Sequence, residues 1–180
     1  NGKVIVNNTA SNYVINRSAD QASTGGSVIN GAVTVIDGEF SGRIENYFGH
    51  KEPVIYGGTF DVKVPAKYLP EGAETETDAN GNVVVKTAAA KVGTVNFSTL
   101  KEATDAAADG DEVVILMPGT YKLPGFAKDI TITAKDGVEV IFDNIGAHNM
   151  QYSNVTFNNV IFDYYPNVNY TGLQHSGNLT

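Results

Sequence analysis

The chain has 180 residues, of which 42% are hydrophobic, and this fraction supports a folded core and excludes an intrinsically disordered protein. Its formal net charge is −8 and no segment combines Lys or Arg with aromatic residues, which argues against nucleic acid and anionic membranes as partners. The chain has no cysteine and no apolar run near the ~20 residues of a membrane helix, so disulfides, thiol catalysis, cysteine-based zinc sites and membrane insertion are not expected.

The segment 1–66 contains short apolar runs that predict strands at Val4–Val6, Tyr13–Ile15, Ser27–Ile29, Val33–Ile36 and Val54–Tyr56. Two of these runs lead into similar segments, Gly38-Glu39-Phe40 and Gly58-Thr59-Phe60. The interval between the two phenylalanines is about one coil of a solenoid, in which each glycine forms a corner and each Phe stacks on its counterpart. The alternative is an ordinary β-sandwich with two similar hairpins.

A β-hairpin is predicted next, because Asn80-Gly81 separates the strand-like runs 73–78 and 82–86 and both residues tolerate positive φ. The segment from Asp78 begins like a calcium loop, but Val83 stands where such a loop needs glycine and Ala89 where it needs an acid. We therefore expect a hairpin and no metal site. Residues 87–90 then form a short Ala-rich linker, which divides the chain into domains 1–87 and 88–180.

One short helix is predicted at the start of the second domain. Thr99 and Glu102 have the spacing of a capping box, and Leu100, Ala103 and Ala107 form a narrow apolar stripe that ends before Gly110. A strand at 112–117 and a turn at 118–121 follow.

A repeat occupies the rest of the chain, with copies at Lys128–Thr133, Ser153–Asn158 and Gly177–Thr180. The aliphatic residues Ile130, Val155 and Leu179 recur at nearly equal intervals. Such a period is typical of a solenoid whose stacked coils bury a shared core. Asn and Thr at repeated positions are expected to form hydrogen-bonded ladders, and the phenylalanines at 142, 157 and 162 to point inward or between coils. Because the last copy reaches Thr180, we expect the natural chain to continue.

The helix and the strand after it resemble the opening of right-handed parallel β-helix proteins of the pectate-lyase-like superfamily. There a segment L-x-E-A-x-x-A-A-x-x-G-D, here residues 100–111, caps the first coil, and P-G-T-Y, here residues 118–121, comes after the next strand. This resemblance implies an all-β fold, a right-handed parallel β-helix with one short capping helix, preceded by a small β region and a β-hairpin. A cap of this kind covers apolar surface and unpaired strand edges.

The wider layout resembles large secreted proteins of anaerobic gut bacteria. The similar segments are Gly57–Phe60, Gly72–Val85 and Ala90–Ala103, within a resemblance that covers about residues 53 to 180. It implies a secreted or cell-surface location in a bacterium. It does not define an activity, because the family includes polysaccharide lyases, glycosidases, adhesins and phage spikes.

Two groups of residues are candidates for chemistry. Tyr164, Tyr165 and Tyr170, together with Asp163, can stack on sugar rings and bond their hydroxyls, or the loop can pack on its own solenoid or on a neighbouring domain. Asp143 and Asp163 end corresponding strands, where they form either a carboxylate pair for cation binding or acid–base work, or simple turn caps. The three histidines, at 50, 148 and 175, lie in polar loops without ligand spacing.

We therefore expect a non-catalytic segment that acts as a spacer, an adhesin or a glycan-contacting module, with a glycan or host-surface ligand as partner. No catalytic set, cofactor or metal site is predicted within the chain. The alternatives are the amino-terminal part of a polysaccharide lyase or glycoside hydrolase, and a component of a phage fibre or spike. The sequence leaves the oligomeric state open.

Overall fold

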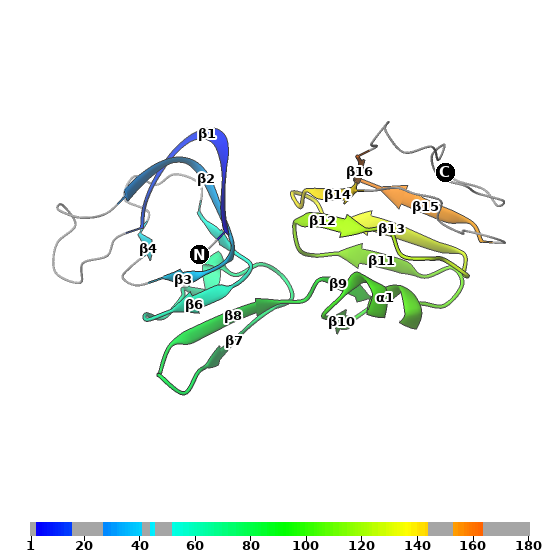
Figure 1. Cartoon of the computed structure of the whole chain (residues 1–180), viewed down its shortest axis with the longest axis horizontal. Helices are drawn as coiled ribbons and strands as arrows, with labels where there is room; N and C mark the ends of the chain where they lie inside the picture. Colours follow the sequence, from blue (N-terminus) through cyan, green and yellow to red (C-terminus); the bar gives the residue numbers. More distant parts are fainter. Residues whose placement is uncertain (1–2, 16–26, 41–43, 46–51, 144–152, 164–180) are drawn as a thin grey trace. The chain divides into compact units, whose positions relative to one another are not determined.

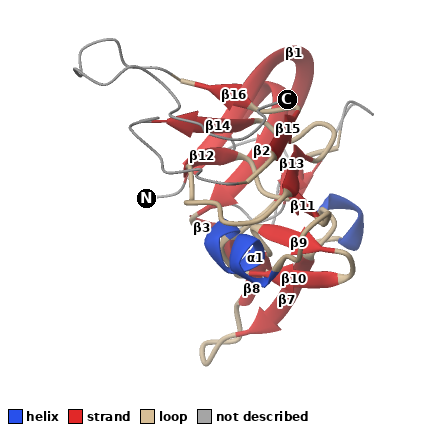
Figure 2. Ribbon diagram, turned by 90° about the vertical axis from the view of Figure 1, so that its right-hand side faces the viewer, coloured by secondary structure: helices blue, strands red, loops and turns tan. Residues whose placement is uncertain are grey.

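The computed structural model describes residues 3–15, 27–40, 44–45, 52–143 and 153–163. The chain is mostly β and contains a β-solenoid of about five turns, with a single α-helix among the described residues (Figures 1 and 2). It divides into two compact units, Asn1–Thr87 and Ala88–Thr180, which are called unit 1 and unit 2 here. The predicted all-β solenoid with one short helix is therefore confirmed.

Unit 1 contains two four-stranded sheets and a short 3₁₀ helix at Ala66–Tyr68. The order in the first sheet is β4-β1-β2-β5, and its strands are β1 (Lys3–Ile15), β2 (Ser27–Asp37), β4 (Ile44–Glu45) and β5 (Val54–Ile55). The order in the second is β3-β6-β8-β7, with β3 (Glu39–Phe40), β6 (Gly58–Phe60), β7 (Ala73–Thr77) and β8 (Val83–Thr87). The prediction of four short strands before residue 37 was wrong. β1 and β2 are long antiparallel partners, and a register shift between Asn7 and Asn12 takes up the break in their apolar pattern.

Two strand pairs of unit 1 repeat at the same interval in the sequence. β2 pairs with β5 and β3 with β6, both in parallel, with Val35 opposite Ile55 and Phe40 opposite Phe60. The rings of Phe40 and Phe60 stack with their centroids 5.0 Å apart, as predicted. At the corner, Gly58 has φ +123°, and a Cβ there would lie 2.9 Å from the Gly38 carbonyl oxygen. Parallel pairing at a fixed interval is the arrangement of stacked coils, because a hairpin would pair the strands in antiparallel.

The predicted hairpin is confirmed in β7 and β8, which pair in antiparallel. Ala73 lies opposite Thr87 at one end of the pair, and Thr77 lies opposite Val83 at the other. β8 also pairs in antiparallel with β6, so the hairpin extends the sheet of the coils. The apolar side of this arrangement forms the core of unit 1, with buried Val33, Val35, Ile55, Phe60, Val64, Tyr68 and Val85.

Unit 2 contains a five-stranded sheet in the order β10-β9-β11-β13-β15 and a three-stranded sheet in the order β12-β14-β16. The strands of the first are β9 (Ala90–Val92), β10 (Val95–Phe97), β11 (Glu112–Ile115), β13 (Ile130–Ala134) and β15 (Val155–Asn158). Those of the second are β12 (Gly119–Lys122), β14 (Val140–Asp143) and β16 (Ile161–Phe162). Successive coils pair in parallel in both sheets, while β9 and β10 add in antiparallel to the edge of β11.

The repeat has the predicted register but not a constant length. Ile130 lies opposite Val155, the equivalent residue of the next copy, as predicted. The sequence separation of Ile130 and Val155 is not kept in the other coils. It is smaller between the paired residues Glu112 and Thr131, and also between Ile141 and Ile161. The longer interval arises between the end of β14 and the start of β15, outside the strands. The third predicted copy, 177–180, lies outside the described residues.

Two segments that were predicted to connect strands, the turn at 118–121 and the linker at 87–90, lie partly within strands. Residues 119–121 of the predicted turn are part of β12, because their backbone pairs with β14 in the next coil. Of the predicted turn only Pro118 stays outside a strand, and the corner is formed by residues 116–118 between β11 and β12. The predicted linker is also shorter than expected, since β8 ends at Thr87 and β9 begins at Ala90. Ala89 and Ala90 are both buried, and their small side chains let the backbone lie close to the core.

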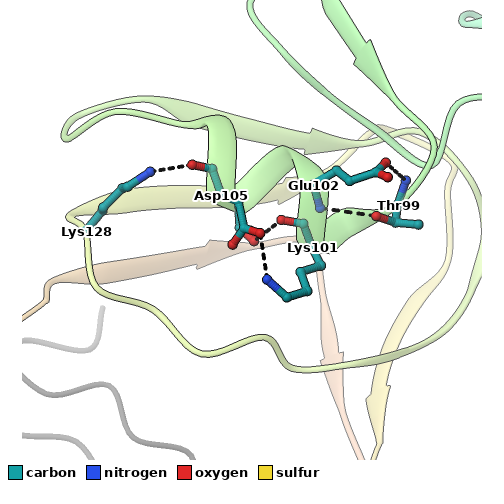
Figure 3. Close-up of polar contacts among 6 residues, drawn as sticks. Thr99, Lys101, Glu102, Asp105 and Lys128 are labelled. Carbon is teal, nitrogen blue, oxygen red and sulfur yellow. Dashed lines mark hydrogen bonds and ion pairs between the residues drawn. The ribbon is translucent and has the colours of Figure 1, made fainter.

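The predicted helix is α1 (Leu100–Ala106), and its capping box is confirmed. The Glu102 amide donates to Thr99 Oγ1 and the Thr99 amide donates to Glu102 Oε2, both at 3.1 Å (Figure 3). Leu100, Ala103 and Ala107 are buried in the core of unit 2, and α1 contacts β9, β10 and β11. The helix ends at Ala106, before the predicted Gly110, because the backbone of Ala107 is extended.

The helix is also fixed to the following coil by Lys128. Its ammonium group donates to the Asp105 carbonyl at 2.6 Å (Figure 3). It also donates to the Ala107 carbonyl, so both bonds lie at the carboxyl end of the helix. Carbonyls at this end have no partner within the helix and carry partial negative charge. A lysine from the next coil therefore satisfies them.

An aromatic cluster occupies the centre of unit 2. Phe142 is fully buried, and its ring lies 5.9 Å from that of Phe157 and 5.8 Å from that of Phe162. Phe142 has the predicted inward position and Phe157 is half-buried against the core. Phe162 stacks between coils, but it is 37% exposed because β16 is the outermost strand of its sheet.

Candidate functional site

The structure bears on only one of the residues in the predicted sugar-binding site. Tyr164, Tyr165 and Tyr170 lie outside the described residues. Asp163 is exposed and directly follows β16, and its amide donates to the Phe142 carbonyl at 2.8 Å. The site therefore stays a prediction.

The carboxylates of Asp143 and Asp163 belong to one column of residues. Phe142 pairs with Phe162 in the parallel sheet, so the next residue of each strand, Asp143 or Asp163, occupies the corresponding position of adjacent coils. Lys122 pairs with Asp143 in the coil before. The column thus presents one amine followed by two carboxylates. Whether these groups bind a cation or act in catalysis stays a prediction.

A second column of polar residues forms a hydrogen-bonded ladder, in which aspartates take part besides the predicted Asn and Thr. The amide of Asp129 donates to Asp109 Oδ1 at 2.9 Å, and the amide and side chain of Asn154 donate to the Asp129 carboxylate at 2.6 and 2.8 Å. On the outer face of the sheet that contains β11, β13 and β15, Thr133 donates to Glu112 and accepts from Asn158 at 3.3 Å. These repeated polar groups use their hydrogen bonds to hold one coil on the next.

A groove of about 550 Å³ lies in unit 1, beside the tip of the hairpin β7–β8. We call it the hairpin groove, and its lining residues are Glu39, Phe40, Thr59, Asp61, Asp78, Asn80 and Asn82. They come from three places in the chain: β3, the strand β6 with the residue after it, and the hairpin turn. The stacked coils bring the first two sets together, and the pairing of β8 with β6 brings the turn beside them.

The turn side of the groove is organised by Asp78. Its Oδ1 accepts from the amides of Asn80 and Asn82 at 2.9 and 2.8 Å, and its Oδ2 accepts from Asn82 Nδ2 at 3.1 Å. These bonds, led by the Asn82 amide, hold the pKa of Asp78 below its usual range. The carboxylate thus serves the turn, as the hairpin interpretation requires, and it fixes the two asparagines that flank Gly81, whose φ is +85°.

The acid stability of the protein should depend on Asp78 and Asp129. Hydrogen bonds from Asn154 also hold the pKa of Asp129 below its usual range. A carboxyl group with a lowered folded pKa contributes stability above its unfolded pKa of about 4 and loses it as the pH falls through the lower folded value. Thermal unfolding measured from pH 6 to pH 2 should therefore show a smaller loss of Tm in Asp78→Asn/Asp129→Asn than in the wild type. Glu74→Gln, on exposed β7, is the control. If the Tm of all three proteins falls equally between pH 6 and pH 2, Asp78 and Asp129 do not determine the acid stability.

Sequence reasoning missed the hairpin groove, although part of its signal was present. The register of Phe40 on Phe60 places Glu39 beside Thr59, since both pairs belong to the same two strands. Alternation along a strand then puts these two polar residues on the opposite face from the rings. The position of the hairpin turn could not be added, because the pairing of β8 with β6 is a contact between distant segments.

No protein family, curated protein or solved structure matches the chain. Within the described residues, no group of three or more His, Asp or Glu side chains is placed to hold a metal ion. The helix of the described chain is too short to cross a membrane. All three histidines lie outside the described residues. The fold alone therefore gives the class, a β-solenoid protein.

Proposed function

We propose that the chain is a non-catalytic segment of a bacterial secreted or cell-surface protein, where it acts as a spacer or adhesin module that contacts glycans. The resemblance of residues 57–60, 72–85 and 90–103 to secreted proteins of gut anaerobes supports the location. The stacking of coils supports a spacer, because each coil needs only its neighbours and the length of such a protein grows with the number of repeats.

The observation that carries this proposal is the ladder of Asp109, Asp129 and Asn154. The polar groups that recur from coil to coil are hydrogen-bonded to one another. A catalytic carboxylate must instead be within reach of a substrate proton or a reacting atom. The repeated polar residues are thus better suited to stabilising the solenoid than to chemistry.

Purified chain incubated with a panel of polysaccharides tests the proposal. We expect binding in a glycan array or by calorimetry. After overnight incubation we expect no release of reducing ends and no unsaturated product, at a detection limit on the order of 10⁶-fold below enzymatic turnover. Turnover of any polysaccharide would contradict the non-catalytic role.

The column of Lys122, Asp143 and Asp163 favours a second candidate, the amino-terminal part of a polysaccharide lyase or glycoside hydrolase. Amines and carboxylates in adjacent coils can supply the acid and base of such reactions. If the chain has turnover, Asp143→Asn/Asp163→Asn should remove it, whereas Asp109→Asn, a ladder variant, should not. Activity that survives in the double variant would place the chemistry elsewhere.

A further inference from the structure

We infer that the hairpin groove of unit 1 binds a neutral, hydroxyl-rich glycan. This inference rests on the proposed glycan-contacting function and gives it a site. The volume of the groove, about 550 Å³, is within the range of roughly 300–1,000 Å³ that is typical of ligand sites. Its lining is rich in groups that suit sugar hydroxyls: two primary amides, a hydroxyl and carboxylates.

The turn that carries the two side-chain amides is ordered without a ligand. Asp78 accepts from the backbone amides of Asn80 and Asn82 and from the side-chain N–H of Asn82, so the turn backbone and the Asn82 side chain are held in place without a ligand. The side chain of Asn80 is exposed, so its amide group can reach a molecule in the groove. An amide donates and accepts at once, as does a sugar hydroxyl. Because the backbone of the turn is already ordered, only the Asn80 side chain has to lose conformational entropy on binding.

The opposite side of the groove is formed by Glu39, Phe40 and Thr59. The carboxylate of Glu39 and the hydroxyl of Thr59 lie on adjacent strands, where the two residues are directly paired. Phe40 is half-buried and its ring is held by stacking on Phe60. The groove therefore has polar groups on both sides, from paired strands on one side and from the hairpin turn on the other.

Charge selects among glycans. Glu39 and Asp78 line the groove, and none of its lining residues within the described part of the chain is Lys or Arg. A polysaccharide of uronic acids or sulfated sugars would bring further negative charge next to these carboxylates, and like charges at short range repel. The groove should therefore bind neutral glycans in preference to acidic ones.

Calorimetry with the whole chain tests the inference. The probes are neutral hexasaccharides of β-1,4-linked glucose, mannose and xylose, and an acidic hexamer of galacturonate. We expect the wild type to bind at least one neutral probe. The double variant Thr59→Val/Asn80→Ala should bind this probe at least about 10-fold more weakly, because each lost hydrogen bond contributes on the order of 1 kcal/mol. Thr75→Val, an exposed threonine on β7 outside the groove, is the matched control and should bind like the wild type.

A second variant, Glu39→Gln, tests the charge. It keeps the shape of the side chain and should improve the affinity for the galacturonate hexamer relative to the neutral probe. Unchanged neutral binding in Thr59→Val/Asn80→Ala would overturn the groove as the site while leaving the glycan-contacting function in place. No binding of any probe by the folded wild type would overturn both. Tighter binding of galacturonate than of every neutral probe would overturn the choice of ligand class.

Discussion

Replacing Phe142 with alanine is expected to lower the free energy of unfolding of unit 2 by about 3–5 kcal/mol. The side chain is fully buried, and it contacts aromatic rings from the coils on both sides. The ring centroid of Tyr121 lies 6.3 Å from it in the coil before, and that of Phe162 lies 5.8 Å from it in the coil after. Removing the ring leaves a cavity between three coils, whose backbones are fixed by parallel pairing and can close it only in part.

Denaturant unfolding of the wild type and variants measures this effect. Phe162→Ala is the matched control, because the same ring type stands in the same column but is 37% exposed. Its effect should be clearly smaller than that of Phe142→Ala, and Phe157→Ala, at a half-buried position, should fall between them. Equal losses for Phe142 and Phe162 would mean that the register of β14 on β16 is wrong.

Local signals predicted the parts of the fold that depend on neighbouring residues. The capping box at Thr99 and Glu102 and the hairpin turn at Asn80-Gly81 could be predicted, because each depends on residue types at a fixed short spacing. The stacked pair of Phe40 and Phe60 could be predicted because the two residues occupy equivalent positions of similar segments. Ile130 and Val155 could be aligned for the same reason, since they occupy equivalent positions of the repeat.

Strand boundaries that depend on a partner strand were not predicted. Residues 119–121 have the composition of a turn, but pairing with β14 makes them a strand. The joining of the early short runs into β1 and β2 likewise follows from their pairing along the whole length. In each case a long-range contact overrides a local preference.

The same distinction applies to the candidate sites. The column of Asp143 and Asp163 could be read from corresponding strand ends, and the structure places both residues at that position. The hairpin groove could not, since Glu39 and Asn80 are far apart in the sequence and meet only through two successive strand pairings, β3 with β6 and β6 with β8.

Replacing Leu100 with aspartate is expected to unfold unit 2 while unit 1 stays folded. Leu100 is 5% exposed and belongs to the core that includes Val113 and Ile115 of the first coil. Among the described residues no basic side chain is buried, so the new carboxylate would lie in the core without a partner. A buried unpaired charge is destabilising by several kcal/mol. Loss of α1 would also uncover the strands that it contacts, β9, β10 and β11, and expose apolar surface and strand edges that favour aggregation.

Limited proteolysis followed by mass spectrometry separates the two units. In the Leu100→Asp variant, fragments from residues 88–180 should disappear first and a fragment near residues 1–87 should persist, because the described cores of the two units share no residue. Ser98→Asp is the matched control: it adds the same charge at an exposed position just before the helix, where a carboxylate is favourable. It should leave the proteolysis pattern and the Tm unchanged. If Leu100→Asp instead removes both halves at the same rate, the two units fold as one cooperative body, and the division at residues 87 and 88 does not separate independent domains.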